Sequence, residues 1–355
     1  MQKRFLALDG LRGVCAVCVL FNHCVDFFHK GPLILHGFLA VDVFFIMSGF
    51  VIALTYEEKL KRRGETGAYL FSRARRLFPT YWIGATFNIS IFVALISAGY
   101  IVSQDTWWMV WLLIPLTTVL MIPDYVTPDG LAYPAMNGVA WSLFTEWIAY
   151  IVYGFSMHRW RTGLLFVLAI LGWGLIASVG VWSGRGWFGG FERSTLLTWG
   201  VLRCLSGFAM GVVIFRIHKH PLFERLPVIS TELLLLFWLC LAGLGSGQIR
   251  PVFDPIIVMI LSPALICLLI RSDFKAPRFC KELGELSYPL YVIHPGIILL
   301  ATYTPVFGLD RGINPVGGLF VVGLCLFMAW IVAKVVSGQR RQIRERYYNF
   351  NVPVR

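Results

Sequence analysis

The chain has 355 residues, of which 57% are hydrophobic and only 14% are charged, and its mean hydropathy is +0.72. Soluble domains carry about 25% charged residues, so the composition excludes a soluble globular protein and indicates an integral membrane protein. The net charge of +12 is spread over the loops between apolar runs. This distribution favours contact with anionic lipid headgroups and argues against nucleic-acid binding.

Ten apolar runs are long enough to cross a bilayer, which takes roughly 17–25 helical residues. In chain order they lie at 13–28, 38–56, 80–100, 139–156, 163–182, 195–215, 231–247, 253–270, 286–303 and 316–336. The first run is short for a span unless its helix begins near Leu6. The sequence therefore predicts an all-α polytopic membrane protein of about ten transmembrane helices, organised as a single domain over residues 1–355.

An eleventh apolar run, WWMVWLLIPLTTVLMI at 107–122, has a proline in its middle. Loops rich in Lys and Arg face the cytoplasm in most membrane proteins. Most of the 31 basic residues fall in loops that share one side if the chain crosses ten times and 107–122 does not cross. We therefore expect 107–122 to be a re-entrant or membrane-embedded segment, and both termini to be cytoplasmic.

Several ionisable residues lie within or beside the predicted spans, where a charged group that faces lipid is costly. The orientation above places them in the outer half of the membrane, where we expect them to face one another: His23, Asp26, Asp42, Glu146 and Arg203. One interpretation is a structural network in which Asp42 or Glu146 pairs with Arg203. The other is a reaction site, for which His23 is the candidate because its side chain exchanges a proton near neutral pH.

A second polar group lies at the predicted cytoplasmic boundary. Arg73 and Arg76 stand three residues apart before Pro79, so on a helix both side chains would project from one face and could clamp a phosphate. Asp9 and Arg12 have the same spacing, and we expect them to pair or to orient that clamp. The alternative is that this basic run serves only the positive-inside bias.

His294 lies near the middle of a predicted span and is followed by Pro295, which frees a backbone carbonyl one turn earlier. For this histidine the sequence favours a structural hydrogen-bonding role over catalysis. Cys15 and Cys18 have a C-x-x-C spacing without a second pair, and we expect neither a metal site nor a redox site there.

Six short motifs follow one another along the chain: LDGLRGVCAVCVLFNH, AVDVFFIMSGFVI, RARRLFPTYW, WSLFTEW, RCLSGFAMGV and ELSYPLYVIHP. In this order they resemble the acyltransferase-3 family, the membrane O-acyltransferases that modify bacterial surface polysaccharides and some antibiotics. The resemblance covers nearly the whole chain. It implies a multi-pass enzyme of the bacterial inner membrane.

The resemblance implies transfer of an acyl group, with acetyl favoured, from cytoplasmic acyl-CoA to a hydroxyl of a sugar or cell-surface glycan. It implies His23 as the catalytic base and Glu146 as the motif acid. Arg73 and Arg76 correspond to an Arg-x-x-Arg pair, and Arg12 shares the first motif with His23. Acyl-CoA would be a donor substrate, and no tightly bound cofactor is expected.

Acyl transfer from a thioester also needs hydrogen-bond donors for the developing oxyanion, for which Arg203 and Tyr288 are candidates. Asp9, Asp42 and His294 complete the expected supporting polar network. Two mechanisms stay open, because His23 could act on the acceptor hydroxyl or first carry the acyl group itself. The alternative function is a transporter or flippase for a lipid-linked or polar substrate, since such proteins also place polar residues within many spans.

Overall fold

The computed structural model describes residues 5–28, 36–101, 118–122, 139–184, 186–187, 196–244, 250–273, 277–308 and 313–350. Within these ranges the chain is almost entirely helical, with one isolated β-bridge between Ser230 and Asp273 and no β-strand. The helices are α1 Leu6–His23, α2 Ala40–Arg63, α3 Thr66–Ser97, α5 Ala140–Phe155, α6 Thr162–Trp182, α7 Val201–Ile217, α8 Pro221–Glu224, α9 Thr231–Gly243, α10 Arg250–Ile256, α11 Ser262–Arg271, α12 Pro277–Tyr303 and α13 Pro315–Phe350. Shorter helical turns are η1 Val25–Phe27, η2 His36–Leu39, η3 Met157–Arg159, η4 Leu196–Gly200, η6 Ile257–Leu261 and η7 Pro305–Phe307.

Eight helical segments in the described ranges are long and apolar enough to cross a membrane. This finding confirms the all-α polytopic prediction. Helix α1 begins at Leu6, so the short first run gains the length that it needed. All ten predicted runs are helical, but α5 has 16 residues and α9 has 13. These two are shorter than the roughly 20 residues of a typical span.

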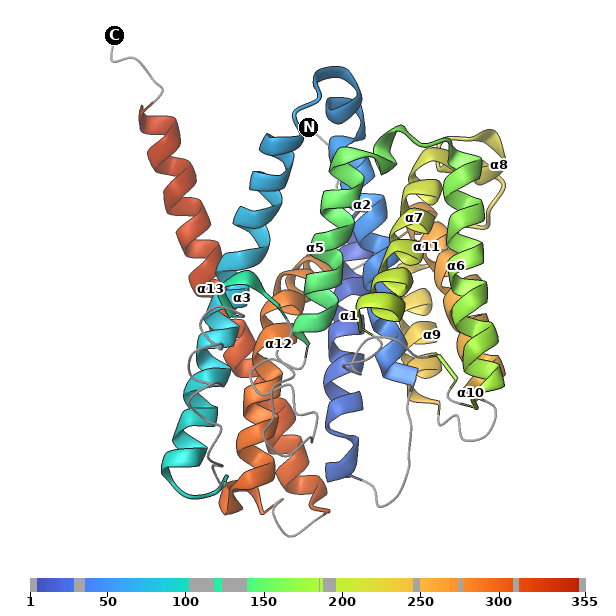
Figure 1. Ribbon diagram of the computed structural model, residues 1–355. Helices are drawn as coiled ribbons and strands as arrows, with labels where there is room; N and C mark the ends of the chain where they lie inside the picture. The colour runs from blue at the N-terminus through green and yellow to red at the C-terminus, as the bar shows by residue number, and fades with distance from the viewer. Residues whose placement is uncertain are drawn as a thin grey trace.

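The long helices run antiparallel to their neighbours in the chain (Figure 1). The start of α1, the turn between α2 and α3 and the final turns of α13 lie at one end of the bundle, which we call the amino end (Figure 1). The ends of α1 and α12 lie at the opposite end, which we call the far end (Figure 1), so His23, the last residue of α1, lies there. Because α3 runs toward the far end and α5 runs back, their directions agree with a connection that makes no net crossing. The run at 107–122 itself lies outside the described residues except for 118–122.

Close helix packing holds the centre of the bundle together. Helix α1 packs along α12, and α2 packs along α7. Gly49 of α2 and Gly211 of α7 allow this second approach, because a Cβ atom at either position would collide with a backbone carbonyl of the other helix. Small residues at such contacts are typical of membrane helices.

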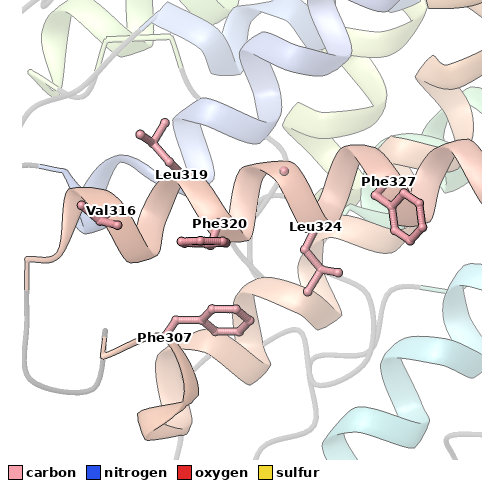
Figure 2. A pocket seen from close by; sticks show the side chains of 7 residues that line it. Phe307, Val316, Leu319, Phe320, Leu324 and Phe327 are labelled. Carbon is pink, nitrogen blue, oxygen red and sulfur yellow. The ribbon is translucent and has the colours of Figure 1, made fainter.

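The outer face of α13 is apolar. Its exposed side chains, with Phe307 of η7, line a groove of about 520 Å³ (Figure 2). The residues that form it are Val316, Leu319, Phe320, Leu324 and Phe327, with Gly323 between them. An exposed apolar helix face is expected where a helix meets lipid.

Candidate active site

A partly open cavity of about 750 Å³ lies between α1, α2, α3, α5, α12 and α13. The cavity wall follows α2 from Val41 to Thr55, which is about 21 Å at 1.5 Å of rise per residue. The hydrocarbon core of a bilayer is roughly 30 Å thick. The cavity therefore extends over much of the depth that a membrane helix crosses.

Three predicted site arginines line the amino end of this cavity: Arg12, Arg73 and Arg76. Arg12 lies 3.2 Å from Asp9, which confirms that these two residues pair. Arg73 is buried, donates a hydrogen bond of 2.7 Å to the Tyr56 hydroxyl and lies over the Tyr56 ring. The sequence prediction that Arg73 and Arg76 share one surface is therefore met, but Arg73 has a fixed protein partner in addition.

The middle of the cavity carries a carboxylate with two hydroxyl partners. Ser48 donates a hydrogen bond of 2.5 Å to Oε1 of Glu146, and Tyr150 donates one of 2.6 Å to the same oxygen. Glu146 and Tyr150 are four residues apart on α5, and such pairs meet on one helix face. Two donors hold the Glu146 carboxylate in one orientation where it faces the cavity.

Two tyrosines of α12 complete the cavity wall. The Tyr288 hydroxyl donates a hydrogen bond of 2.8 Å to the carbonyl of Leu77, so its proton already has an acceptor. The hydroxyls of Tyr291 and Ser142 lie 2.7 Å apart. The Tyr291 ring also contacts the His294 ring, with centroids 6.2 Å apart, so Tyr291 lies between the cavity and the histidines.

His23 is the last residue of α1 and lies beside His294 of α12. His23 Nδ1 is 2.8 Å from His294 Nε2, and the two rings are stacked with centroids 5.0 Å apart. His294 is buried, whereas part of His23 is exposed. Neither histidine is among the residues that line the cavity. Asp26 lies in η1 beyond the end of α1 and is exposed.

Asp42 and Arg203 form a buried ion pair away from the cavity. Arg203 donates two hydrogen bonds to the Asp42 carboxylate, at 2.8 and 2.5 Å, and Trp187 Nε1 donates a third at 3.1 Å. This pair confirms one of the two structural pairings that the sequence allowed. Glu146 has other partners.

The expectation that the ionisable residues face one another is therefore wrong. They divide into the histidine pair, the Glu146 carboxylate in the cavity and the Asp42–Arg203 pair. Asp42 and Ser48 are six residues apart on α2, which rotates their side chains about 240° around the helix axis. One consequently points at α7 and the other at α5. Assignment by membrane depth ignores this rotation.

Sequence analysis missed a second buried polar group near Asp42. Asp254 of α10 accepts hydrogen bonds from Arg250 Nε at 3.0 Å and from the Trp187 backbone at 3.2 Å. His36 Nδ1 lies 2.9 Å from the other Asp254 oxygen. Arg250 is the first residue of α10. The four-residue spacing of Arg250 and Asp254 was the available signal.

An internal cavity with convergent polar groups is the usual form of a ligand or catalytic site. The fold and the site thus define a membrane-embedded protein that binds or transforms a ligand between its helices. Residues 5–334 match the model of the acyltransferase-3 family, described as an acyltransferase domain. The chain belongs to this family and is an acyltransferase, which favours the enzyme over the transporter alternative.

Curated relatives agree with this membership. The chain is 25% identical over 343 residues to the peptidoglycan O-acetyltransferase OatA of Listeria monocytogenes, a match that covers 85% of this chain and 50% of OatA. It is 32% identical over 166 residues to protein 2 in the picA locus of Rhizobium radiobacter, which covers 44% of this chain and 83% of that protein. It is 23% identical over 269 residues to the exopolysaccharide production protein ExoZ of Rhizobium meliloti, with 73% and 75% covered. No solved structure matches the chain.

Proposed function

We propose that this enzyme transfers an acetyl group from acetyl-CoA, bound at the amino end, to a hydroxyl of a cell-surface polysaccharide at the far end. The single observation that carries the proposal is the cavity, which begins at three arginines and ends at Tyr291, beside the His294–His23 pair. The names of relatives support the group and the acceptor, since OatA is a peptidoglycan O-acetyltransferase and ExoZ serves exopolysaccharide production.

The donor would bind at the amino end. Coenzyme A carries several phosphate charges, and Arg12, Arg73 and Arg76 line the cavity at that end. Guanidinium groups bind phosphate through paired hydrogen bonds. Most basic loops share one side if the chain crosses ten times, so under the positive-inside bias the amino end would be cytoplasmic. The membrane would be the bacterial inner membrane, as the family resemblance implies. Acetyl-CoA would then reach the enzyme from the cytoplasm.

The thioester arm would enter the cavity along α2 and α5. Glu146, held by Ser48 and Tyr150, and the Tyr291 hydroxyl lie along that course. The Asp42–Arg203 pair does not line the cavity, so Arg203 is a poor candidate for the oxyanion donor. Tyr291 is better placed than Tyr288, whose hydroxyl donates to a backbone carbonyl, and than Tyr150, whose hydroxyl donates to Glu146.

His23 would serve as the base. The acceptor hydroxyl gives its proton to the imidazole while its oxygen attacks the thioester carbonyl. The new O–C bond forms, the C–S bond breaks, and the proton passes from the imidazole to the coenzyme A sulfur. A variant of this route, in which His23 carries the acetyl group between the two substrates, uses the same residues.

Replacement of His23 tests the proposal. His23→Gln keeps a polar side chain but removes the proton acceptor, and a positioned base contributes about 10²–10⁴ in rate. We expect purified His23→Gln protein to bind acetyl-CoA as the parent does and to lose transfer by at least about a hundredfold. Transfer above roughly a tenth of the parent rate would refute His23 as the base.

A further inference from the structure

The hydrogen bonds around His294 determine which of its nitrogens carries hydrogen. His294 Nδ1 lies 3.0 Å from the carbonyl oxygen of Leu290. A carbonyl oxygen only accepts hydrogen bonds, so His294 Nδ1 must carry a hydrogen. A neutral imidazole has one N–H group, and His294 Nε2 therefore presents a lone pair toward His23.

The same reasoning extends to His23. His294 Nε2 accepts, and His23 Nδ1 is 2.8 Å away, so His23 Nδ1 must be the donor. A neutral His23 then has its lone pair on Nε2. No hydrogen bond from another described residue reaches that nitrogen, and His23 is an exposed residue. The pair thus directs the basic nitrogen of His23 away from α12.

The position of His294 depends on a break in the hydrogen bonding of α12. Pro295 has no N–H group, which leaves the carbonyl one turn earlier without its helical donor. The side chain of Asn88 from α3 inserts in the next turn. Its Oδ1 accepts from Gly296 N at 3.0 Å, and its Nδ2 donates to Val292 O at 3.1 Å. A side chain inserted in this way is a known cause of local helix distortion.

Gly296 makes this insertion possible. A Cβ atom at that position would collide with the Asn88 side chain. Asn88 is itself buried, and its amide replaces the hydrogen bond that Gly296 N would otherwise make within α12. The turn that carries His294 is consequently fixed from both sides, by Asn88 of α3 and by the stacked ring of His23 from α1.

We propose that His294 is a positioning residue that sets the tautomer of His23, so that Nε2 is the nitrogen that takes the acceptor proton. When Nε2 gains this proton, the Nδ1–H bond to His294 persists and helps to stabilise the resulting imidazolium. A group that orients a catalytic imidazole in this way plays the part that a carboxylate plays in hydrolase triads. The tautomer of His23 is inferred from the hydrogen bonds alone. Only the role of Nε2 as proton acceptor rests on the proposed function.

Nitrogen chemical shifts of the histidine rings test the tautomer directly. In ¹⁵N-labelled full-length protein, the His23 signals can be assigned by their loss in His23→Gln. We expect Nδ1 to carry hydrogen and Nε2 to be unprotonated in the parent protein. We expect a mixture of tautomers or the opposite one in His294→Phe. An Nε2–H tautomer in the parent protein would overturn the inference, whether or not His23 is the base.

Steady-state kinetics test whether the tautomer of His23 matters for turnover. His294→Gln supplies an amide oxygen that can still accept from His23 Nδ1–H, whereas His294→Phe keeps a ring of similar shape without an acceptor. We expect His294→Phe to lower kcat by at least about tenfold. The loss should not exceed the roughly 10²–10⁴ that the base itself contributes. The KM for acetyl-CoA should stay unchanged. We expect His294→Gln to restore most of that loss.

His158→Phe is a matched control. His158 is also buried and bonded to a backbone carbonyl, at 2.8 Å from Tyr153 O, but it lies outside the cavity and the histidine pair. We expect this change to lower yield and not kcat. Equal kcat in His294→Phe and His158→Phe, with His23→Gln inactive, would overturn the role of His294 and leave the proposed function intact. An active His23→Gln protein would instead refute the proposed function.

Discussion

Single residues in the arginine run differ sharply despite their proximity in sequence. Arg75 and Arg76 are both exposed, but Arg76 lines the cavity and Arg75 does not. Arg75 lies over the Phe71 ring instead. The three-residue spacing of Arg73 and Arg76 was visible in the sequence and predicted their shared surface. The bond from Arg73 to Tyr56 was not predictable, because it joins α3 to the last turns of α2.

Arg76→Lys tests the phosphate role. Lysine keeps the charge but lacks the planar fork that pairs with phosphate. A hydrogen bond to a charged group contributes on the order of 1.5–3 kcal/mol, so the dissociation constant of acetyl-CoA should rise about ten- to a hundredfold. Titration calorimetry of purified protein measures this constant. Arg75→Lys is the control. Equal acetyl-CoA affinities in the two variants would indicate that Arg76 serves only the positive-inside bias.

At the scale of elements, helix rotation explains what the sequence could and could not predict about the site. The lengths of the apolar runs and the charges of the loops predicted each helix and its direction. Both signals can be read from local composition. The partners of Asp42, Glu146 and His23 depend on which helix lies beside each face. The sequence alone does not say that Asp42 of α2 faces α7 while Ser48 faces α5, so the single cluster that we predicted was wrong.

The contact between α2 and α7 should be the most sensitive to charge removal. Asp42→Ala would leave the buried Arg203 guanidinium without its carboxylate, and breaking a buried ion pair costs about 3–5 kcal/mol. We expect a lower melting temperature and a lower folded yield, while turnover per folded molecule is largely kept. Thermal unfolding in detergent measures the effect. Replacement of both partners by leucine should restore much of the stability, because it also removes the buried guanidinium charge.

Glu58→Ala is the control for that experiment. Glu58 and Arg62 form an exposed ion pair one turn apart on α2, and exposed pairs contribute only about 0–1 kcal/mol. Its melting temperature should match the parent. If Asp42→Ala were as stable as Glu58→Ala, the pair could not be holding α2 on α7.

At the scale of the whole molecule, the helices, their alternation and the family were all within reach of the sequence. Ten apolar runs became ten helical segments, and six motifs in order identified the acyltransferase-3 family that the family model confirms. Two features needed the structure. The cavity arises from the packing of α1, α2, α3 and α5 against α12 and α13 from the other end of the chain, and the histidine pair joins residues that are 271 positions apart.

In the proposed function, the acetyl group crosses most of the membrane within the protein. The arginines and the histidine pair occupy opposite ends of the bundle, and the cavity lies between them. Donor and acceptor would therefore be used from opposite sides. This sidedness is the central claim, and it does not depend on the identity of the sugar.

Sealed vesicles that contain the protein with its amino end outward test this claim most directly. Orientation can be set by selecting vesicles in which Gly64→Cys, in a cysteine-free background, reacts with an impermeant thiol reagent. Polysaccharide from a strain that lacks the gene is enclosed, radiolabelled acetyl-CoA is added outside, and His23→Gln vesicles are the control. We expect label on the enclosed polysaccharide in parent vesicles and none in the control. Label that appears only when both substrates are on the same side would contradict the account.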